Sequence, residues 1–299
     1  MYKKYINSIG NTPLRCFNKS NIYLKLEGHN PSGSIKDRSI SNMVLNIKDK
    51  NTPYCLVTSG SAGISLYNLH NNLRMKNDII ITIPLKYSNK KIPSMLINKN
   101  NIKLHNTFDS VQISNNGTIN IVLIDDIFMN VFSHAKNIIN KNQWILLDQH
   151  YNTDCIDIHK KTVNEILMDC PDVTDIICAT GTGGTAAGLM KYLPSYINVH
   201  SRPSISGEIE GLSDVGRYNN YCNPLNICNY YESNYTLDDA IKYKNIIETN
   251  SKFLVGYSTG AAFGLAKKIN MTDKWLTDIR KIKSNKKIVV ISPDGIYNE

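Results

Sequence analysis

The sequence predicts an α/β fold built around mostly parallel strands. Three observations carry this prediction. The chain has 299 residues, enough for one large globular domain or two ordinary ones, each with a buried core. Short apolar runs alternate with helix-like stretches along the whole chain, without an internal repeat or a long linker. Several of the apolar runs end in turns rich in Gly, Ser and Thr.

The elements follow one another in a strand-then-helix rhythm. Apolar runs typical of buried strands lie at residues 21–26, 54–58, 78–83, 120–124, 145–148, 175–179, 253–257 and 287–291. Segments that we expect to be helical lie at residues 38–47, 64–73, 131–139, 160–168, 186–193, 236–249 and 261–269. Residues 203–235, rich in Asn, Tyr, Gly and Pro, are expected to form a long loop.

Composition excludes several classes of protein. Apolar residues make up 41% and charged residues 20%, which disfavours a wholly disordered chain or a coiled coil. No apolar run is long enough to cross a membrane, and the N-terminus has no apolar signal-peptide core, so we expect a cytoplasmic protein without a membrane partner. Asn, Lys and Ile are abundant, as in proteins from AT-rich genomes, which include those of some parasites and large viruses. If the protein comes from such a source, we expect it in the cytoplasm of the host.

Cysteine spacing, the absence of metal-binding motifs and the net charge limit the kinds of ligand that we expect. The seven cysteines are scattered without a C-x-x-C pair, so we expect them to be reduced, and no metal-binding motif is present. The net charge of +9 suits anionic ligands such as phosphates and carboxylates. The dense basic segment 280–287 is interpreted as a solvated helix face, and no nucleic-acid motif accompanies it, so no nucleic-acid partner is expected.

A glycine-rich turn, GTGGT, follows the expected strand at residues 175–179 and leads into a helix. In a parallel sheet, ligands bind beyond the carboxyl ends of the strands. Glycines let the backbone approach an anion, and the free N–H groups at a helix start favour a phosphate. A glycine-rich turn that binds no ligand is the alternative.

Two further turns present hydroxyl groups. TSGSAG (residues 58–63) combines hydroxyls with exposed backbone N–H groups, which suits a carboxylate. Capping of the following helix by Ser59 or Ser61 is the alternative. After the expected strand at residues 253–257, Ser258 and Thr259 stand at another helix start, where capping is again the alternative.

Lys36 occupies an unusual position, where the turn NPSGS gives way to a helix. The positive end of the helix dipole disfavours an ammonium group there, and burial would lower its pKa further. Such a lysine is a nucleophilic amine that can form a Schiff base. A solvated lysine near a helix end is the alternative reading.

Five blocks in order, IGNTPL, NPSGSIKDR, TSGSAG, GTGGT and GYSTGA, resemble the cysteine synthase and cystathionine β-synthase family of fold-type-II pyridoxal-phosphate (PLP) enzymes. The closest likeness within it is to cysteine synthases of the O-acetylserine sulfhydrylase type. The resemblance extends from Ile9 to the PDG sequence at residues 293–295. It implies a fold like that of the tryptophan synthase β-subunit, with two three-layer α/β domains and the cofactor in the cleft. The smaller domain would comprise residues 37–145, and the larger residues 1–36 and 146–299. The resemblance, not the composition, implies a homodimer.

The resemblance also implies roles for single residues. Lys36 would be the catalytic, Schiff-base lysine. The other cofactor-binding residues would be Ser61, Gly181, Thr182, Gly183, Gly184, Thr185 and Ser258. The substrate-binding residues would be Thr58, Ser59, Gly60, Ser61, Ala62 and Gln149.

The chemistry implied is β-replacement on an O-activated serine, with Lys36 as general base and an aminoacrylate that a sulfur nucleophile such as sulfide attacks. The protein would be a transferase or lyase of amino-acid biosynthesis, specifically cysteine biosynthesis. Where relatives have TSGNTG, this chain has Ser61 and Ala62, and QFxNP is replaced by QHYNT. These departures leave open another donor or nucleophile, as in cystathionine or diaminopropionate synthesis, and a non-catalytic PLP-binding regulatory homologue.

Overall fold

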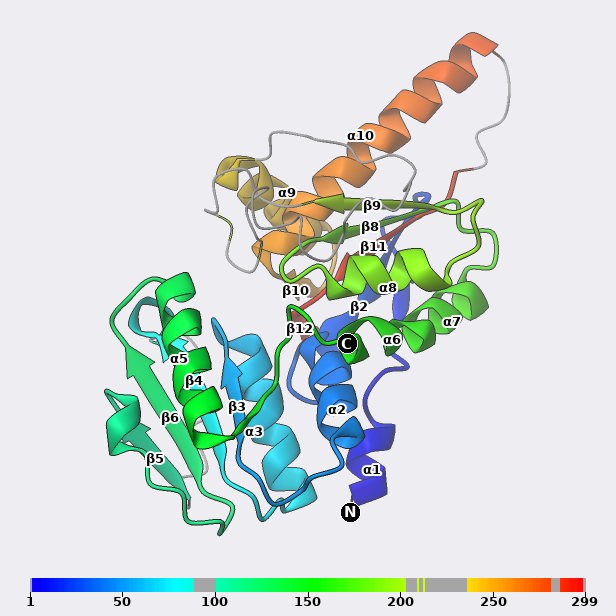
Figure 1. Cartoon of the computed structure of the whole chain (residues 1–299). Coiled ribbons are helices and arrows are strands. Elements are labelled where there is room, and N and C mark those ends of the chain that lie inside the picture. Colours follow the sequence, from blue (N-terminus) through cyan, green and yellow to red (C-terminus); the bar gives the residue numbers. More distant parts are fainter. Residues whose placement is uncertain are drawn as a thin grey trace. The chain divides into compact units, whose positions relative to one another are not determined.

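A computed structural model of the chain describes residues 2–88, 101–202, 209, 212, 236–280 and 286–297 (Figure 1). The chain divides into two compact units. Unit 1 comprises Met1–Ile9 and Lys36–Asp154, and unit 2 comprises Gly10–Ile35 and Cys155–Glu299. Relative to the domains expected from the sequence, residues 1–9, Lys36 and residues 146–154 fall with the first unit. Helix α1 (Tyr2–Asn7) contacts another helix of unit 1, which accounts for the first of these differences.

Unit 1 is built on a five-stranded sheet in which every pair of neighbouring strands is parallel. From edge to edge, the order is β5 (Ile102–His105), β6 (Ile119–Ile124), β4 (Ile79–Pro84), β3 (Tyr54–Val57) and β7 (Ile145–Leu146). Its longer helices are α2 (Lys36–Asn46), α3 (Ser61–Leu73) and α5 (Phe128–Asn142). Two single turns of 3-10 helix, Leu85–Tyr87 and Phe108–Ser110, follow β4 and β5.

Both faces of the unit 1 sheet are buried, as a parallel sheet requires. Cys55 and Val57 of β3 pack with Val131 and Ala135 of α5 in one apolar cluster. Leu56, which points to the opposite face, is also fully buried. Figure 1 shows α2 and α3 on the side of the sheet away from α5. The unit is therefore a three-layer α/β structure.

Unit 2 contains a second five-stranded sheet, in which only the edge strand β1 is antiparallel. The order is β1 (Leu14–Cys16), β2 (Ile22–Leu26), β11 (Ile288–Ser292), β8 (Asp175–Ala179) and β9 (Asn198–Arg202). The helices of this unit are α6 (Asp154–Asp157), α7 (His159–Asp169), α8 (Gly184–Tyr192), α9 (Leu237–Asn250) and α10 (Tyr257–Arg280). A short 3-10 helix, η1 (Glu27–His29), extends β2.

The central strand β11 shows how the unit 2 core divides between two faces. Ile288 and Val290 belong to a cluster that includes residues of α9 and α10. Val289 and Ile291 belong to a second cluster that includes residues of α7 and α8. The alternation of a strand thus gives each helical layer its own apolar face, and unit 2 is also three-layered.

The α/β class and the parallel sheets are confirmed. The prediction of a strand over residues 253–257 is wrong at its C-terminal end. Only Phe253–Val255 is extended, as β10, and it pairs with β12 (Gly295–Tyr297) in a separate antiparallel ribbon. Tyr257 already begins α10, because the small residues that follow favour close helix packing in the core.

Four short strands, β1, β5, β9 and β12, were not expected from the sequence. In β1 and β5 most side chains are partly or fully exposed, so an edge strand lacks the apolar run that marks a buried one. The expected loop 203–235 lies outside the described residues except for Ile209 and Leu212, and the basic segment 280–287 is described only at its ends. Within the part of the chain that is described, no helix combines the length and apolar character needed to cross a membrane.

Candidate functional site

Lys36 is the first residue of α2 and is half-buried. The next two residues, Asp37 and Arg38, are almost fully buried. The Ser65 hydroxyl of α3 donates a 2.5 Å hydrogen bond to Asp37 Oδ1, which fixes the start of α2 against the first turns of α3. The backbone at Lys36 is therefore held rigidly, while the side chain remains partly accessible.

The turn from β3 into α3 holds residues 58–62. The Thr58 backbone N–H donates to the Thr82 carbonyl of β4 at 3.0 Å, and Thr58 Oγ1 accepts from the Gly60 N–H at 3.0 Å. Gly60 has φ of 146°, which favours glycine, and it is the N-cap of α3. No side chain caps this helix, so the capping alternative for Ser59 and Ser61 is wrong in this structure.

Gln149 reaches the same corner of unit 1. Its Nε2 donates to the carbonyl of Val57, the last residue of β3, at 3.4 Å. Its Oε1 is buried and has no hydrogen-bond partner among the described residues. A buried polar atom without a partner costs free energy, so a bound molecule that supplies a donor would be favoured there.

In unit 2, the GTGGT turn leads from β8 into α8. Gly183 has φ of 87° and is the N-cap, and no side chain makes a capping hydrogen bond to this helix. A Cβ atom at Gly184 would lie 3.2 Å from the carbonyl oxygen of Cys155 and 3.3 Å from its Cβ. Glycine is thus required twice, once for the turn and once for the close approach of α8 to residue 155.

Ser258 is the second residue of α10 and is 7% exposed. Its neighbour Thr259 is hydrogen-bonded through Oγ1 to the Ser292 hydroxyl at 3.0 Å. A Cβ atom at Gly256 would lie within 2.3 Å of Asp294 Oδ1, so the Asp294 carboxylate packs directly against the turn before Ser258. Ser292, the last residue of the central strand β11, and Asp294, two residues further on, support this turn, a role that the sequence analysis did not assign. The SPDG sequence was the only signal for it.

The residues present fit a phosphate-bearing cofactor and an amino-acid substrate. Glycines at a helix N-terminus suit a phosphate, and small hydroxyls suit polar ring atoms and a carboxylate. Several of these hydroxyls make no hydrogen bond to any described residue, which leaves them available to a ligand: Ser59, Ser61, Thr182, Thr185 and Ser258.

The candidate residues form two groups. Unit 1 brings together Lys36, residues 58–62 and Gln149, whereas unit 2 carries residues 181–185 and Ser258. That both groups hold one cofactor remains a prediction.

The surroundings of Lys36 also include a buried phenol. Burial raises the pKa of Tyr5 far above its usual range, and the negative charge of Asp37 raises it further. Tyr5 therefore stays neutral and does not serve as an anionic base beside α2.

Comparison with known proteins gives one family and several relatives. A family model described as pyridoxal-phosphate dependent enzyme matches residues 6–294. The cysteine synthase of Buchnera aphidicola is 27% identical over 99% of this chain and 95% of its own length. The cystathionine β-synthase of Saccharomyces cerevisiae is 26% identical over 97% of this chain but only 61% of its own length. A hydrogen sulfide-producing enzyme from Fusobacterium nucleatum has a similar fold, with a TM-score of 0.77, 24% identity and coverage of 97% of both chains.

Proposed function

Because the chain belongs to the pyridoxal-phosphate-dependent enzyme family, we propose that it is a cysteine synthase-like enzyme that joins an O-activated serine to a sulfur nucleophile. The family identifies the chain as a PLP-dependent enzyme, and its relatives support β-replacement as the reaction class. The choice of serine donor and sulfur nucleophile is supported by the cysteine synthase match over nearly the full length of both chains.

Each candidate residue has a place in this proposal. Lys36 Nζ would hold the cofactor covalently, residues 181–185 would bind its phosphate, and Ser258 would meet its ring nitrogen. When bound, PLP withdraws electrons from the amino acid, so that the α-proton and the β-substituent can leave. Lys36 Nζ would accept the α-proton. A neutral Ser258 hydroxyl would leave the ring nitrogen largely unprotonated, which would favour elimination and replacement over transamination.

The substrate carboxylate would bind in the turn between β3 and α3. The backbone N–H groups after Gly60 and the hydroxyls of Ser59 and Ser61 provide donors for it. The buried Oε1 of Gln149 would instead accept from a donor group of the bound molecule. The observation that carries the proposal is the rigid corner in which Asp37 and Ser65 fix Lys36 beside this turn. The amine proposed to move the proton and the loop proposed to hold the carboxylate thus belong to the starts of two helices in contact, α2 and α3.

The experiment is a donor and nucleophile panel with purified protein and PLP. O-acetylserine with sulfide is expected to give cysteine, identified by mass spectrometry, and Lys36→Ala is expected to abolish turnover. Borohydride reduction followed by peptide mapping is expected to place the cofactor on Lys36. An adduct on another lysine would refute the assignment of Lys36.

A second function is favoured by the match to yeast cystathionine β-synthase and by the Ser61 and Ala62 departures. Here the same scaffold would use another donor or nucleophile, so the panel includes serine, homocysteine and amine nucleophiles. A protein that binds PLP on Lys36 but shows no spectral response to any amino acid would instead be a regulatory homologue.

A further inference from the structure

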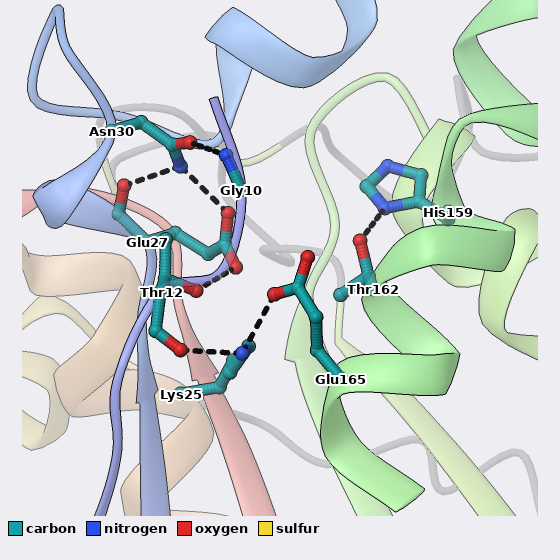
Figure 2. A network of polar contacts seen from close by, with 8 residues as sticks. All are labelled: Gly10, Thr12, Lys25, Glu27, Asn30, His159, Thr162 and Glu165. Carbon is teal, nitrogen blue, oxygen red and sulfur yellow. Dashed lines mark hydrogen bonds and ion pairs between the residues drawn. The ribbon is translucent and has the colours of Figure 1, made fainter. Parts of the chain in front are cut away.

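A buried polar network in unit 2 joins three segments that are distant in the sequence (Figure 2). The first is residues 10–12, the second runs from β2 into η1, and the third is α7. The Thr12 hydroxyl donates to Glu27 Oε1 at 2.7 Å. On the other side, Lys25 Nζ donates to the Thr12 carbonyl at 2.6 Å and pairs with Glu165 Oε2 of α7 at 2.8 Å.

Two ionisable groups of this network are completely buried. Lys25 and Glu27 are 0% exposed. Burial of a charge is unfavourable unless hydrogen bonds and an opposite charge compensate for it. Replacing buried ionic groups by apolar residues of similar volume is often neutral or stabilising, so the position of these groups suggests a role beyond stability.

Asn30 connects Glu27 to the loop that leads to Lys36. Its Nδ2 donates to Glu27 Oε2 and to the Glu27 carbonyl, both at 2.8 Å, while its Oδ1 accepts from the Gly10 N–H at 2.8 Å. A carboxylate only accepts hydrogen bonds, so Nδ2 must face Glu27 and the amide can take only this orientation. Every polar atom of the Asn30 side chain is thus fixed, and Glu27 sets its orientation.

The loop is held at both ends. At its start, the Asn30 carbonyl accepts from the Gly33 N–H at 2.8 Å, in a turn that Gly33 makes with φ of 80°. At its end, the Ile35 N–H donates to the Pro293 carbonyl at 2.7 Å, directly before Lys36. Asn30 at one end and the Pro293 carbonyl at the other thus anchor the short turn that sets the position of the residue before Lys36.

We propose that Glu27 is a positioning residue for Lys36. Its carboxylate orients Asn30, Asn30 sets the loop 30–35, and the loop sets the place at which Lys36 meets the cofactor. This inference rests on the proposed role of Lys36 as the cofactor lysine. The other arm of the network, Lys25 with Glu165, joins β2 to α7 and is structural.

The test compares Glu27→Gln with a matched control, Glu165→Gln. Both replace a carboxylate of the network by an amide of the same shape. In Glu27→Gln, an amide NH2 that faces Asn30 leaves the Asn30 NH2 without its Glu27 side-chain acceptor. An amide NH2 that faces Thr12 instead takes away the acceptor of the Thr12 hydroxyl proton. Two quantities are measured on the PLP-loaded protein. They are the dissociation constant of PLP and the pH midpoint of the visible absorbance of the lysine-bound cofactor. The thermal midpoint is measured on the cofactor-free protein.

Glu27→Gln is expected to weaken PLP binding about tenfold, as for a buried donor left without an acceptor, and to shift the pH midpoint. Glu165→Gln is expected to lower the thermal midpoint and to leave both cofactor measurements unchanged.

Equal effects of the two single variants on the thermal midpoint, with no change in either cofactor measurement, would overturn the proposal. Should Glu27→Gln fail to fold, Asn30→Ser serves instead, because serine is too short to bridge Gly10 and Glu27. Wild-type cofactor measurements in Asn30→Ser would refute the proposal. The mapping of the adduct in wild-type protein tests Lys36 separately, so failure of the proposed function is distinguishable.

Discussion

Ser61 is the residue at which the candidate substrate loop, TSGSAG, differs most from the TSGNTG of similar proteins. It opens α3, and its hydroxyl makes no hydrogen bond to a described residue. Asparagine is longer and carries two N–H donors where serine has one O–H, so Ser61→Asn should reach both the cofactor and the substrate carboxylate. We expect PLP to remain bound and kcat/KM with O-acetylserine to rise about fivefold to tenfold, the effect of one regained hydrogen bond.

The measurement is a steady-state assay on the donor panel. A loss of activity with the preferred donor would contradict this prediction and indicate that the loop is shaped for another substrate. No change with any donor would show that Ser61 takes no part in substrate binding.

Asp175 illustrates how single contacts set a pH dependence. Burial alone would raise its pKa, but hydrogen bonds from His200, Thr174 and Asn198 and the nearby Lys286 ammonium outweigh it and lower the pKa to about 2. A carboxyl whose pKa is lower in the folded state contributes stability above its unfolded pKa of about 4 and loses it as the pH falls through 2. We expect unfolding by guanidinium to show a loss of about 2 kcal/mol over this window.

Asp175→Asn is the matched variant for this acid dependence. It should be less stable than the wild type at pH 7 and show a flatter dependence between pH 4 and pH 2, because the titrating group is gone. An acid dependence as steep as that of the wild type would assign the effect to other carboxylates.

At the scale of elements, the packing of α9 against α10 depends on a glycine. A Cβ atom at Gly260 would lie 2.1 Å from the Ala240 carbonyl oxygen and 2.9 Å from the Lys244 nitrogen, both backbone atoms of α9. Backbone cannot move aside as a flexible side chain can, so Gly260→Ala must separate the helices. We expect a loss of about 2–3 kcal/mol in the free energy of unfolding.

The control for this helix contact is Met271→Ala, in the same helix but 70% exposed. It should change the stability by less than about 0.5 kcal/mol. Equal stability of Gly260→Ala and the wild type would show that the two helices do not approach as closely as described. Because Ser258 lies only two residues before Gly260 in α10, Gly260→Ala should also weaken PLP binding.

At the scale of the whole molecule, we expect a homodimer, as the resemblance implies. Light scattering at micromolar concentration should give twice the chain mass of 33.7 kDa. A monomer would contradict this prediction without affecting the fold or the cofactor assignment.

Local patterns in the sequence were sufficient for the α/β class, for most strands and helices and for the turns that carry the candidate site. Apolar runs, glycines that need positive φ and a lysine at a helix start act over a few neighbouring residues, so their signal can be read along the chain. The family, and with it the PLP cofactor, followed from these same blocks and was confirmed. The roles of the individual site residues stay predictions.

Only the tertiary structure decided which distant segments meet. It placed the last long strand, β11, at the centre of a sheet, so that Ser292 and Asp294 support the turn before Ser258. It also showed that Lys25 and Glu27, two charged residues at the end of β2, are buried in a network with Thr12 and Glu165. Strand order and the burial of charges depend on pairing between residues far apart in the sequence, and local periodicity carries no record of that pairing.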